Sequence, residues 1–583
     1  MLGHAGDEYP YDSGDGFWTD GDLIFTLQYP DCRVRAPDAT ALDKAHFIWQ
    51  FPAMSVLNGE DFLEAGWAPG PQIGQALVKA AEYEARGVTD PAYLLKLLRR
   101  DFPPTAPKLT MKAEPAPLAE AIEATCPEDE RNIKSVRRYM NELLQTPVVT
   151  RGAVMPDACP AGSVPATIPV GGAVAVENAI IPSAHSADIC CSMHATFFQC
   201  PKGVTEMLDD LMASTRFGMG GRRPENYVPH SVNHENVWQN PFLQGLREDA
   251  LKHMADQGDG NHFAYLGRIR ITEAARQQLR AAGHVELADS LTGHDESLVL
   301  VTHHGSRGLG AKVYARGQKA ALAHVKRHAI DIPAPAAWLD YGTQEGRDYW
   351  EALQYVSRWT KANHESIHAR FLERTGSVKV AAFGNEHNFV WKRGDTFLHG
   401  KGATPAWKDE AGRPLLGLIP LNMASPILVV LGRDNEDYLS FCPHGAGRNQ
   451  SRTAMLRAYR NEEGELDAKR VQQALEHSTR GIEARWYYGK PDLSESPLGY
   501  KPAAQVKAQI QQFGLADVVA EIEPLGSIMA GDSGPPPWIR RKDELTPKQL
   551  RAIEHRSDRR KERQRLRDLD DGGNVEVEAD EDD

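Results

Sequence analysis

The sequence contains few cysteines and no long hydrophobic run. Its 7 cysteines are thinly spread over 583 residues, and this odd number does not suit a disulfide framework. No run of 18 or more apolar residues is present, so we expect no membrane-spanning helix. The first residues, MLGHAGDEYPYDSGDG, are polar and acidic and lack the basic start and apolar stretch of a signal peptide. These absences predict a cytoplasmic protein.

The sequence also lacks an excess of positive charge. It has 66 Lys and Arg residues against 80 Asp and Glu residues, a formal net charge of -14. This balance argues against a protein coated with positive charge for nucleic acid. A local basic groove is still allowed, because phosphate binding depends on the local field. Hydrophobic residues make up 41% and charged residues 25% of the chain, which is typical of a soluble globular protein.

Composition divides the chain into three parts. Residues 1–105 form a mixed N-terminal extension, in which GDLIFTLQYP has strand-like alternation and AYLLKLLRRDF has helical spacing. Prolines around residues 103–120 predict a linker, and residues 120–534 form the main domain. Residues 535–583 carry a dense Lys/Arg run and an acidic end, which is typical of a solvated helix with a disordered tail. An RNA-contacting arm is the alternative for this tail.

The main domain has the sequence pattern of an α+β fold. Residues 128–145 predict a helix, because the segment starts acidic and carries spaced apolar positions. From residue 147 onward, short apolar runs alternate with glycine-rich turns, and helical stretches lie between them at 317–329 and 349–374. This pattern predicts a single large domain with several mixed sheets.

Several Cys, His, Asp and Asn residues stand beside these turns. They are Asp188 and Cys191 in SADICCSM, Asn261 and His262 in GDGNHF, His303 in THHGSRGLG, His387 and Asn388 in GNEHNF, and His444 in CPHGAGR. A single histidine near a turn is more often structural than a ligand. Together, imidazole, thiolate and carboxylate groups suit a transition metal, and glycine turns let a phosphate approach the backbone. The set therefore predicts a metal site that handles phosphate.

The same residues carry a family resemblance. AVMPD at 153–157 and AIIPSAHSADICCSM are followed by GNHF, HHGSRGLG, HN, HGKGATPA, HGAGR and SPLGYK. In these motifs and in their order, residues 148–531 resemble the RtcB RNA ligases, also called 3′-phosphate/5′-hydroxyl or tRNA-splicing ligases. The resemblance implies mixed sheets around a central metal-containing cleft.

The resemblance also implies roles for single residues. His444 matches the histidine that accepts GMP, and Cys191 matches a thiolate that bridges two Mn²⁺ ions. The matching metal ligands are Asp188, Cys191, His262, His303 and His387. The matching nucleotide-contacting positions are Asn261, His262, Asn388, Pro420, Met423, Gly445, Ala446, Gly447 and Lys501. Arg307 and Arg448 are either phosphate clamps or members of structural ion pairs.

The implied activity is a GTP- and Mn²⁺-dependent RNA ligase. It would join RNA 3′-phosphate or 2′,3′-cyclic phosphate ends to 5′-hydroxyl ends through a histidine–GMP intermediate, in RNA repair or tRNA splicing. We expect a monomer without membrane association, and the resemblance allows an activating protein partner.

The sequence departs from the family pattern in several motifs. Ala158 and Cys159 follow the MPD motif where the family has a histidine, Tyr265 stands where it has a nucleotide-contacting glutamate, and PLNM at 420–423 replaces its glycine-containing loop. These changes motivate two alternatives. One is a metal-dependent phosphohydrolase or capping enzyme that acts on nucleic-acid 3′ ends, and the other is a catalytically silent RNA-binding protein.

Overall fold

The computed structural model divides the chain into two compact units, Met1–Lys108 and Leu109–Asp583. The described residues are 56–67, 70–103, 108–162, 164–218, 220–461 and 466–532, with the short strands β1 (Trp18–Thr19) and β2 (Asp22–Leu23). The predicted strand in GDLIFTLQYP lies outside the described residues apart from β2, and the charged tail lies entirely outside them. Among the described residues, no helix has both the length and the apolar character needed to cross a membrane.

Among its described residues, the first unit contains three helices around a small apolar core. They are α1 (Gly59–Glu64), α2 (Pro71–Ala85) and α3 (Pro91–Asp101). Phe62, Trp67 and Leu94 are buried between them. The α3 helix confirms the helical spacing of AYLLKLLRRDF. It begins where Asp90 accepts a hydrogen bond from the Ala92 N–H and Pro91 occupies the first turn, a favoured helix start.

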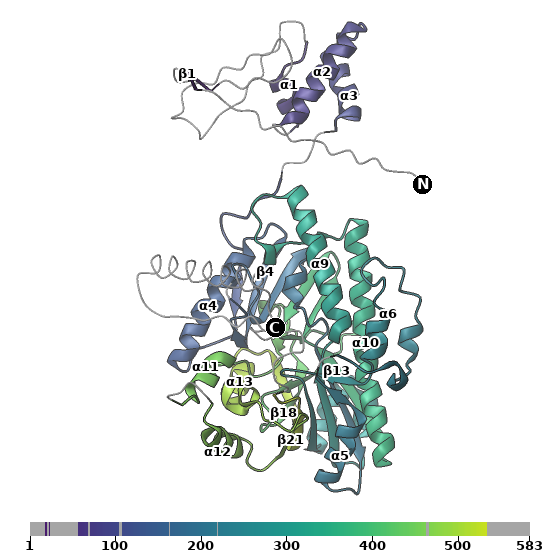
Figure 1. The fold of residues 1–583 in the computed structure, drawn as a ribbon, viewed down its shortest axis with the longest axis vertical. Coiled ribbons are helices and arrows are strands. Elements are labelled where there is room, and N and C mark those ends of the chain that lie inside the picture. The colour runs from purple at the N-terminus through teal and green to yellow at the C-terminus, as the bar shows by residue number, and fades with distance from the viewer. Residues whose placement is uncertain are drawn as a thin grey trace, which may run out of the picture. The chain divides into compact units, whose positions relative to one another are not determined.

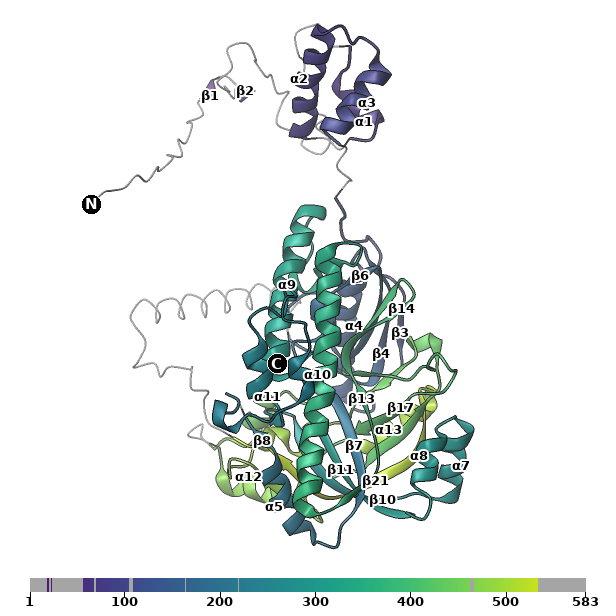
Figure 2. The ribbon, with the colours of Figure 1, turned by 90° about the vertical axis from the view of Figure 1, so that its right-hand side faces the viewer.

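The second unit is built around an eight-stranded sheet (Figures 1 and 2). The strands run in the order β13 (Val378–Glu386), β7 (Ser192–Gln199), β11 (Glu296–His304), β10 (Phe263–Arg270), β21 (Ala516–Met529), β18 (Ile427–Gly432) and β17 (Leu416–Pro420), with β20 (Glu483–Trp486) beside β21. The sheet curls until its edge strands meet. The Leu418 N–H donates to Asn385 Oδ1 at 2.8 Å, and Asn385 Nδ2 donates to the Leu418 carbonyl at 3.5 Å. One amide side chain therefore joins β13 to β17.

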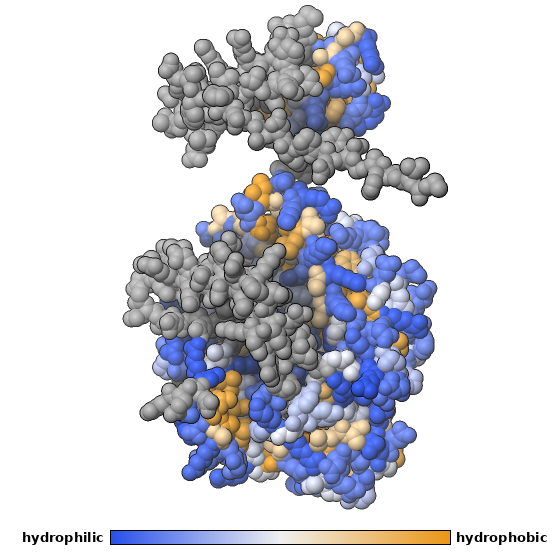
Figure 3. All heavy atoms as spheres, in the orientation of Figure 1, coloured by the Kyte–Doolittle hydropathy of each residue, from blue (hydrophilic) through white to orange (hydrophobic). Residues whose placement is uncertain are grey.

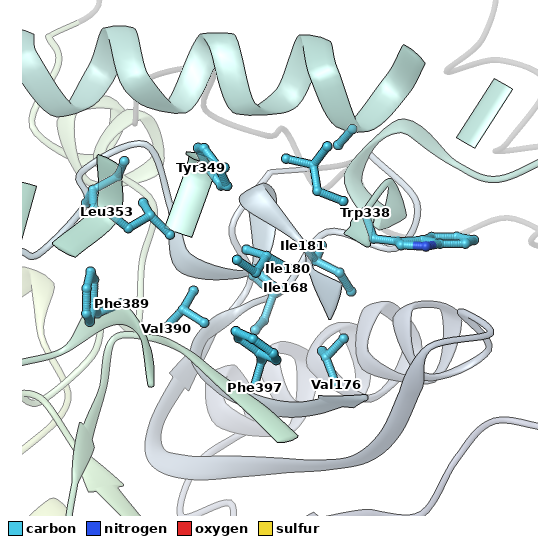
Figure 4. Close-up of a cluster of buried hydrophobic side chains, with 14 of the residues drawn as sticks. Ile168, Val176, Ile180, Ile181, Trp338, Tyr349, Leu353, Phe389, Val390 and Phe397 are labelled. Carbon is cyan, nitrogen blue, oxygen red and sulfur yellow. The ribbon is translucent and has the colours of Figure 1, made fainter. Parts of the chain in front are cut away.

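A second sheet packs against three long helices. Its strands are β14 (Asn388–Arg393), β15 (Thr396–Lys401), β5 (Val170–Glu177), β4 (Val149–Cys159) and β3 (Leu118–Glu120), and the helices are α4 (Pro127–Leu144), α9 (Arg307–His328) and α10 (Gln344–Thr375). Figure 4 shows part of the core that these elements share, with Tyr349 and Leu353 above Phe389, Val390 and Phe397. The three helices confirm those predicted from the sequence.

The remaining elements are short. The helices are α5 (Val204–Ser214), α6 (Arg247–Lys252), α7 (Glu273–Ala281), α8 (Val285–Ser290), α11 (Arg452–Ala458), α12 (Ala468–Ser478) and α13 (Ala503–Gln512). The strand pairs are β12 (Leu339–Asp340) with β6 (Ala179–Ile180), β16 (Ala403–Pro405) with β19 (Phe441–Pro443), and β8 (Arg216–Phe217) with β9 (Asp256–Gly258). On the face in Figure 3, atoms not hidden by grey are mostly hydrophilic, with hydrophobic residues in small separate patches. The predicted α+β class is confirmed.

Strands β7 and β11 are buried on both faces. Side chains alternate along a strand, so Met193 and Phe197 of β7 pack with Val301 of β11 inside the curl. On the opposite face, His194 and Thr196 of β7 face α10. These two faces hold two different groups of histidines, and the inner one contains the candidate site.

Candidate functional site

The predicted metal ligands come together at one end of the curled sheet. They are Asp188, Cys191, His262, His303 and His387. Antiparallel pairing explains why distant segments meet here, because His303 lies opposite both Met193 and Phe263, and Ser192 lies opposite Glu386. The start of β7, the end of β11, the start of β10 and the end of β13 therefore share one edge. Strand register therefore brings ligands that are far apart in the sequence close together in space.

Cys191 lies at the centre of the cluster. Its Sγ is 3.1 Å from His303 Nε2 and 3.6 Å from His262 Nε2. His303 Nε2 lies 3.1 Å from His387 Nε2, and His262 Nε2 lies 2.9 Å from Asp188 Oδ2. The ligand atoms form two convergent groups that share the thiol, one with His303 and His387 and the other with Asp188 and His262. This arrangement suits two metal ions joined by one thiolate.

The donor set fits a transition metal. His303 Nδ1 lies 3.3 Å from the Asn261 carbonyl, an acceptor, so Nδ1 carries the proton and the Nε2 lone pair faces the cluster. His387 Nδ1 is buried without a hydrogen-bond partner among the described residues. Neutral imidazoles with one thiol and one carboxylate are ligands that Mn, Fe, Co, Ni and Zn accept. The residues present can therefore hold a metal.

Burial controls the protonation of the cluster. It lowers the pKa of His303 to about 3, helped by the neighbouring His262, and it holds the pKa of His387 well below the ordinary value. Burial also raises the pKa of Cys191 far above its ordinary value, with Asp188 adding to the effect. Burial alone would raise the pKa of Asp188, but His262 and Arg307 outweigh it and hold the pKa below its ordinary value. A bound cation would favour the thiolate that burial disfavours.

His444 lies beside this cluster, with its ring centroid 4.8 Å from that of His387. Its Nδ1 is 2.6 Å from Asp157 Oδ2 and 2.9 Å from the Gly402 carbonyl oxygen. Both neighbours are acceptors, so Nδ1 carries the proton and the Nε2 lone pair is left free to attack an electrophile. Asp157 is fully buried and also accepts a hydrogen bond from the His444 N–H at 3.2 Å. The carboxylate therefore orients the imidazole.

Asp157 is a site residue that sequence reasoning missed. The MPD motif contains Asp157, but no local pattern predicts which distant side chain its carboxylate contacts. In the structure, β4 carries Asp157 and the segment after β19 carries His444, and 287 positions separate them. The position of Asp157 within the family motif AVMPD was the one available signal.

Two glycines permit the close packing around the site. Gly447 has φ +72°, and a Cβ there would overlap the carbonyl oxygen of Asp157. A Cβ on Gly305 would overlap the carboxylate of Asp188. The HGAGR and HHGSRG motifs therefore need these glycines for steric reasons, because each lets the backbone pass directly over an acidic site residue.

The predicted nucleotide-contacting residues have different surroundings. Asn388 Oδ1 accepts a hydrogen bond from the Gly402 N–H at 2.7 Å, which fixes the turn whose carbonyl faces His444. Asn261 is exposed beside His262, and Met423 is buried. Gly445 and Ala446 directly follow His444, with Gly445 close to the carbonyl of Pro420 at the end of β17. Asn261, Asn388, Pro420, Gly445 and Ala446 thus lie close to the metal cluster or to His444.

Lys501 is buried under the Asp157 segment. Its Nζ donates to the carbonyl of Pro156 at 2.9 Å and to that of Ala158 at 3.0 Å. Burial lowers the pKa of this lysine, and the charges of Cys159 and Asp129 oppose the shift. Lys501 therefore holds the backbone on both sides of Asp157 in this structure.

Tyr265, Arg307 and Arg448 differ in their distance from the cluster and in their partners. Tyr265 donates to the Ile522 carbonyl at 2.9 Å and is buried in the sheet core, away from the cluster. Arg307 Nη1 lies 3.3 Å from His262 Nδ1, and its Nε is buried without a hydrogen-bond partner among the described residues. Arg448 lies 3.8 Å from Glu495 and over the Tyr500 ring, which favours its structural role.

Comparison with known proteins identifies one family. A family model described as tRNA-splicing ligase RtcB matches residues 229–530. A tRNA-splicing ligase RtcB of Thermococcus kodakarensis is 24% identical over 433 residues, covering 61% of this chain and 84% of the relative. The protein of the same name from Archaeoglobus fulgidus is 27% identical over 313 residues, covering 48% of this chain and 60% of the relative. RNA-splicing ligase RtcB2 of Escherichia coli is 27% identical over 421 residues, covering 70% of this chain and 96% of the relative.

Proposed function

Because the chain belongs to the RtcB family, we propose that it is an RNA ligase that uses GTP and Mn²⁺. It joins an RNA 3′-phosphate or 2′,3′-cyclic phosphate end to a 5′-hydroxyl end. The observation that carries the proposal is the pairing of His444 with Asp157 beside the cluster of candidate metal ligands. The names of the relatives, which contain tRNA-splicing ligase and RNA-splicing ligase, support an activity on RNA.

His444 is the proposed nucleophile of the first step. Its Nε2 lone pair attacks the α-phosphorus of GTP, a P–N bond forms, and the P–O bond to pyrophosphate breaks. The imidazole gains positive charge as the bond forms. Asp157 stabilises that charge by accepting the Nδ1 proton in a hydrogen bond, with Oδ2 lying 2.6 Å from Nδ1. The same contact keeps Nε2 aimed away from the carboxylate.

The next two steps move the GMP group and then release it. An oxygen of the RNA 3′-phosphate attacks the phosphorus of the adduct, the P–N bond breaks, and His444 returns to its neutral form. The 5′-hydroxyl oxygen of the second RNA then attacks the activated 3′-phosphorus, loses its proton to water and expels GMP. A 2′,3′-cyclic phosphate is first hydrolysed to the 3′-phosphate.

The proposed metal ligands and nucleotide contacts are those that the family resemblance implies, and the convergence of the ligand atoms supports the metal ligands. Asp188, Cys191 and His262 would hold one Mn²⁺ ion, and Cys191, His303 and His387 the other. Bound metal supplies positive charge that neutralises phosphate oxygens. The proposed nucleotide-contacting residues are Asn261, His262, Asn388, Pro420, Met423, Gly445, Ala446, Gly447 and Lys501. The cytoplasmic location, the monomeric state, an activating partner and the choice between RNA repair and tRNA splicing stay predictions.

The test is covalent labelling with nucleotide. Purified full-length protein is mixed with Mn²⁺ and α-labelled GTP, or with α-labelled ATP in parallel, and is analysed on denaturing gels after acid or alkali treatment. We expect an acid-labile, alkali-stable label from GTP that His444→Ala abolishes. His477→Ala is the matched control, because His477 is exposed on α12. Ligation of a 3′-phosphate RNA to a 5′-hydroxyl RNA is measured with the same preparations.

Each alternative has a distinct outcome in this test. A folded, metal-loaded protein that forms no adduct but removes or modifies 3′-end phosphates would be the phosphohydrolase or capping enzyme. A protein that binds RNA and does neither would be the catalytically silent binder. Labelling by ATP in place of GTP would retain the ligase chemistry and overturn the nucleotide assignment.

A further inference from the structure

One cavity in the larger unit is lined by arginines. It has a volume of about 610 Å³ and lies between the segment after β8, the segment before η3 (Ser231–His234), and α10. Its charged lining residues are Arg216, Arg222, Arg223 and Arg370, and no acidic residue of the described part of the chain lines it. A cavity of this volume is large enough for a nucleotide-sized group.

The arginines are held in place by the backbone around them. Arg222 donates from Nε to the Met254 carbonyl at 3.0 Å and from Nη2 to the Ala255 carbonyl at 2.6 Å. Arg370 donates from Nε to the Ser214 carbonyl at 2.8 Å. These contacts pre-organise guanidinium groups around the cavity without neutralising their charge.

The charge around the cavity is unbalanced. Arg216 lies 3.2 Å from the buried carboxylate of Asp256, which the neighbouring His253 also contacts. Burial lowers the pKa of Arg222, and the charges of Arg370 and Arg216 lower it further, whereas Asp256 opposes the shift. Like charges gathered around one space repel each other, and an anion in that space relieves the repulsion.

The arginine cavity is connected to the metal cluster through β9. Strands β8 and β9 are paired, and the Gly218 N–H donates to the Gly258 carbonyl at 2.7 Å. Gly258 packs directly under the guanidinium of Arg307, which lies 3.3 Å from His262. His262 lies six positions after Asp256, so their Cα atoms are at most about 22 Å apart. An RNA strand whose end lies at the cluster of candidate metal ligands can therefore reach the cavity within a few nucleotides.

We propose that this arginine-lined cavity binds phosphodiester groups of the RNA strand whose end lies at the metal cluster. The planar guanidinium fork matches two phosphate oxygens, and several forks around one space suit a repeated phosphate backbone. Binding there is independent of base sequence, because the arginines contact only phosphate. The inference rests on the proposed function, which supplies RNA as the ligand.

The test measures RNA affinity of the full-length protein against salt. A 12-nucleotide, 5′-fluorescein-labelled RNA with a 3′-phosphate is titrated by fluorescence anisotropy between 50 and 200 mM KCl. Arg223→Gln and Arg370→Gln are each expected to weaken binding about tenfold at the lowest salt. Each is also expected to reduce the slope of log K against log [KCl] by about 0.7, the value for one lost single-strand phosphate contact. Arg370→Lys should recover part of the affinity.

Two features keep the test decisive. The side chain of Arg223 is exposed and makes no hydrogen bond or ion pair with the described residues, so we expect the replacement to leave the fold intact. The matched control is Arg327→Gln, an exposed arginine that lies 20 residues after Arg307 on α9 and therefore about 30 Å away along the helix. The control should bind RNA like the wild type.

Failure of this inference differs from failure of the proposed function. If wild-type protein forms the His444 adduct and ligates RNA, while both arginine variants keep the wild-type affinity and salt slope, the cavity does not bind the strand. If the variants instead need more GTP to form the adduct, the cavity binds the triphosphate of GTP, and the assignment of the cavity to RNA is overturned. Absence of the adduct in wild-type protein, with arginine-dependent RNA binding intact, would reject the ligase and retain the cavity.

Discussion

Two groups of buried histidines lie on opposite faces of strands β7 and β11, and the groups differ in how their nitrogen atoms are used. On the inner face, His303 stands with Cys191 and His387 in a convergent group. On the face toward α10 lie His194, His304, His364 and His368. Within the described part of the chain, the convergent groups of three or more ligand atoms are the two that share Cys191.

Two of the α10-face histidines, His364 and His368, are matched by hydroxyl groups. Thr302 Oγ1 lies 2.6 Å from His364 Nδ1 and 2.8 Å from His368 Nε2. Thr196 Oγ1 lies 2.7 Å from His368 Nδ1, and Ser192 Oγ lies 3.0 Å from His364 Nε2. Each of these imidazoles therefore has a partner at both nitrogens. The comparison shows that histidine-rich sequence alone does not predict a metal site, because the partner of each nitrogen decides its role.

The largest effect should come from removing the shared thiol. Cys191→Ala takes one ligand from each of the two groups, so we expect loss of at least half of the bound Mn²⁺ and a fall in ligation of about 1000-fold or more. Metal content is measured by mass spectrometry after loading and desalting. Cys190→Ala is the matched control, since the neighbouring Cys190 belongs to the core and to neither group. Equal metal content in Cys191→Ala and wild type would show that the inner group around Cys191 is not the metal site.

A smaller effect should follow from changing the residue that orients the nucleophile. Asp157→Asn keeps the metal ligands but replaces the acceptor at His444 Nδ1, so we expect normal metal content and adduct formation slowed about 100-fold or more. Single-turnover labelling with GTP measures the rate. The glutamine variant of the exposed Asp437, Asp437→Gln, is the control. An unchanged labelling rate would assign Asp157 a purely structural role.

On the α10 face, a substitution should affect stability and leave metal binding unchanged. Thr196→Val removes the hydroxyl that pairs with His368 Nδ1 and leaves a buried nitrogen without a partner, at a cost of about 1 to 3 kcal/mol. Urea unfolding measures the free energy, and mass spectrometry measures the metal. Loss of Mn²⁺ from a folded Thr196→Val protein would show that the two faces are not independent.

The smallest effect is that of a single histidine on stability over one pH unit. Burial lowers the pKa of His194 to about 4 and holds the pKa values of His364 and His368 well below 6.5. These rings stay neutral in the folded protein but take up protons in the unfolded chain below pH 6.5. Stability is therefore full above pH 6.5 and falls between 6.5 and 4, by up to about 1.4 kcal/mol per pH unit for each ring.

His194→Gln tests this pH dependence. Urea unfolding of metal-free protein at pH 7.5, 6.5 and 5.5 should give the variant a slope shallower by about one proton below pH 6.5. Replacing His477, an exposed histidine on α12, should leave the slope unchanged. Parallel slopes for wild type and His194→Gln would show that His194 titrates alike in both states.

Much of the fold and most of the candidate site could be predicted from the sequence. The acidic start and spaced apolar residues before residue 145 predicted α4, and the resemblance to the family motifs named the five residues that lie together in the cluster. Local periodicity and turn chemistry act over a few residues, which is why they are visible in the chain itself. The contact between Asp157 and His444 was not predictable, because it depends on how the segment after β19 lies against β4.

By itself, the sequence determined which residue types stand at the turns, where the long helices run, and which family the chain resembles. The tertiary structure alone decided which histidines meet. Strand register places His303 beside Cys191 and turns its neighbour Thr302 toward His364 and His368 on α10. The physical reason is the two-residue period of a β-strand, which sends adjacent side chains to opposite faces, while antiparallel pairing brings residues more than a hundred positions apart into contact.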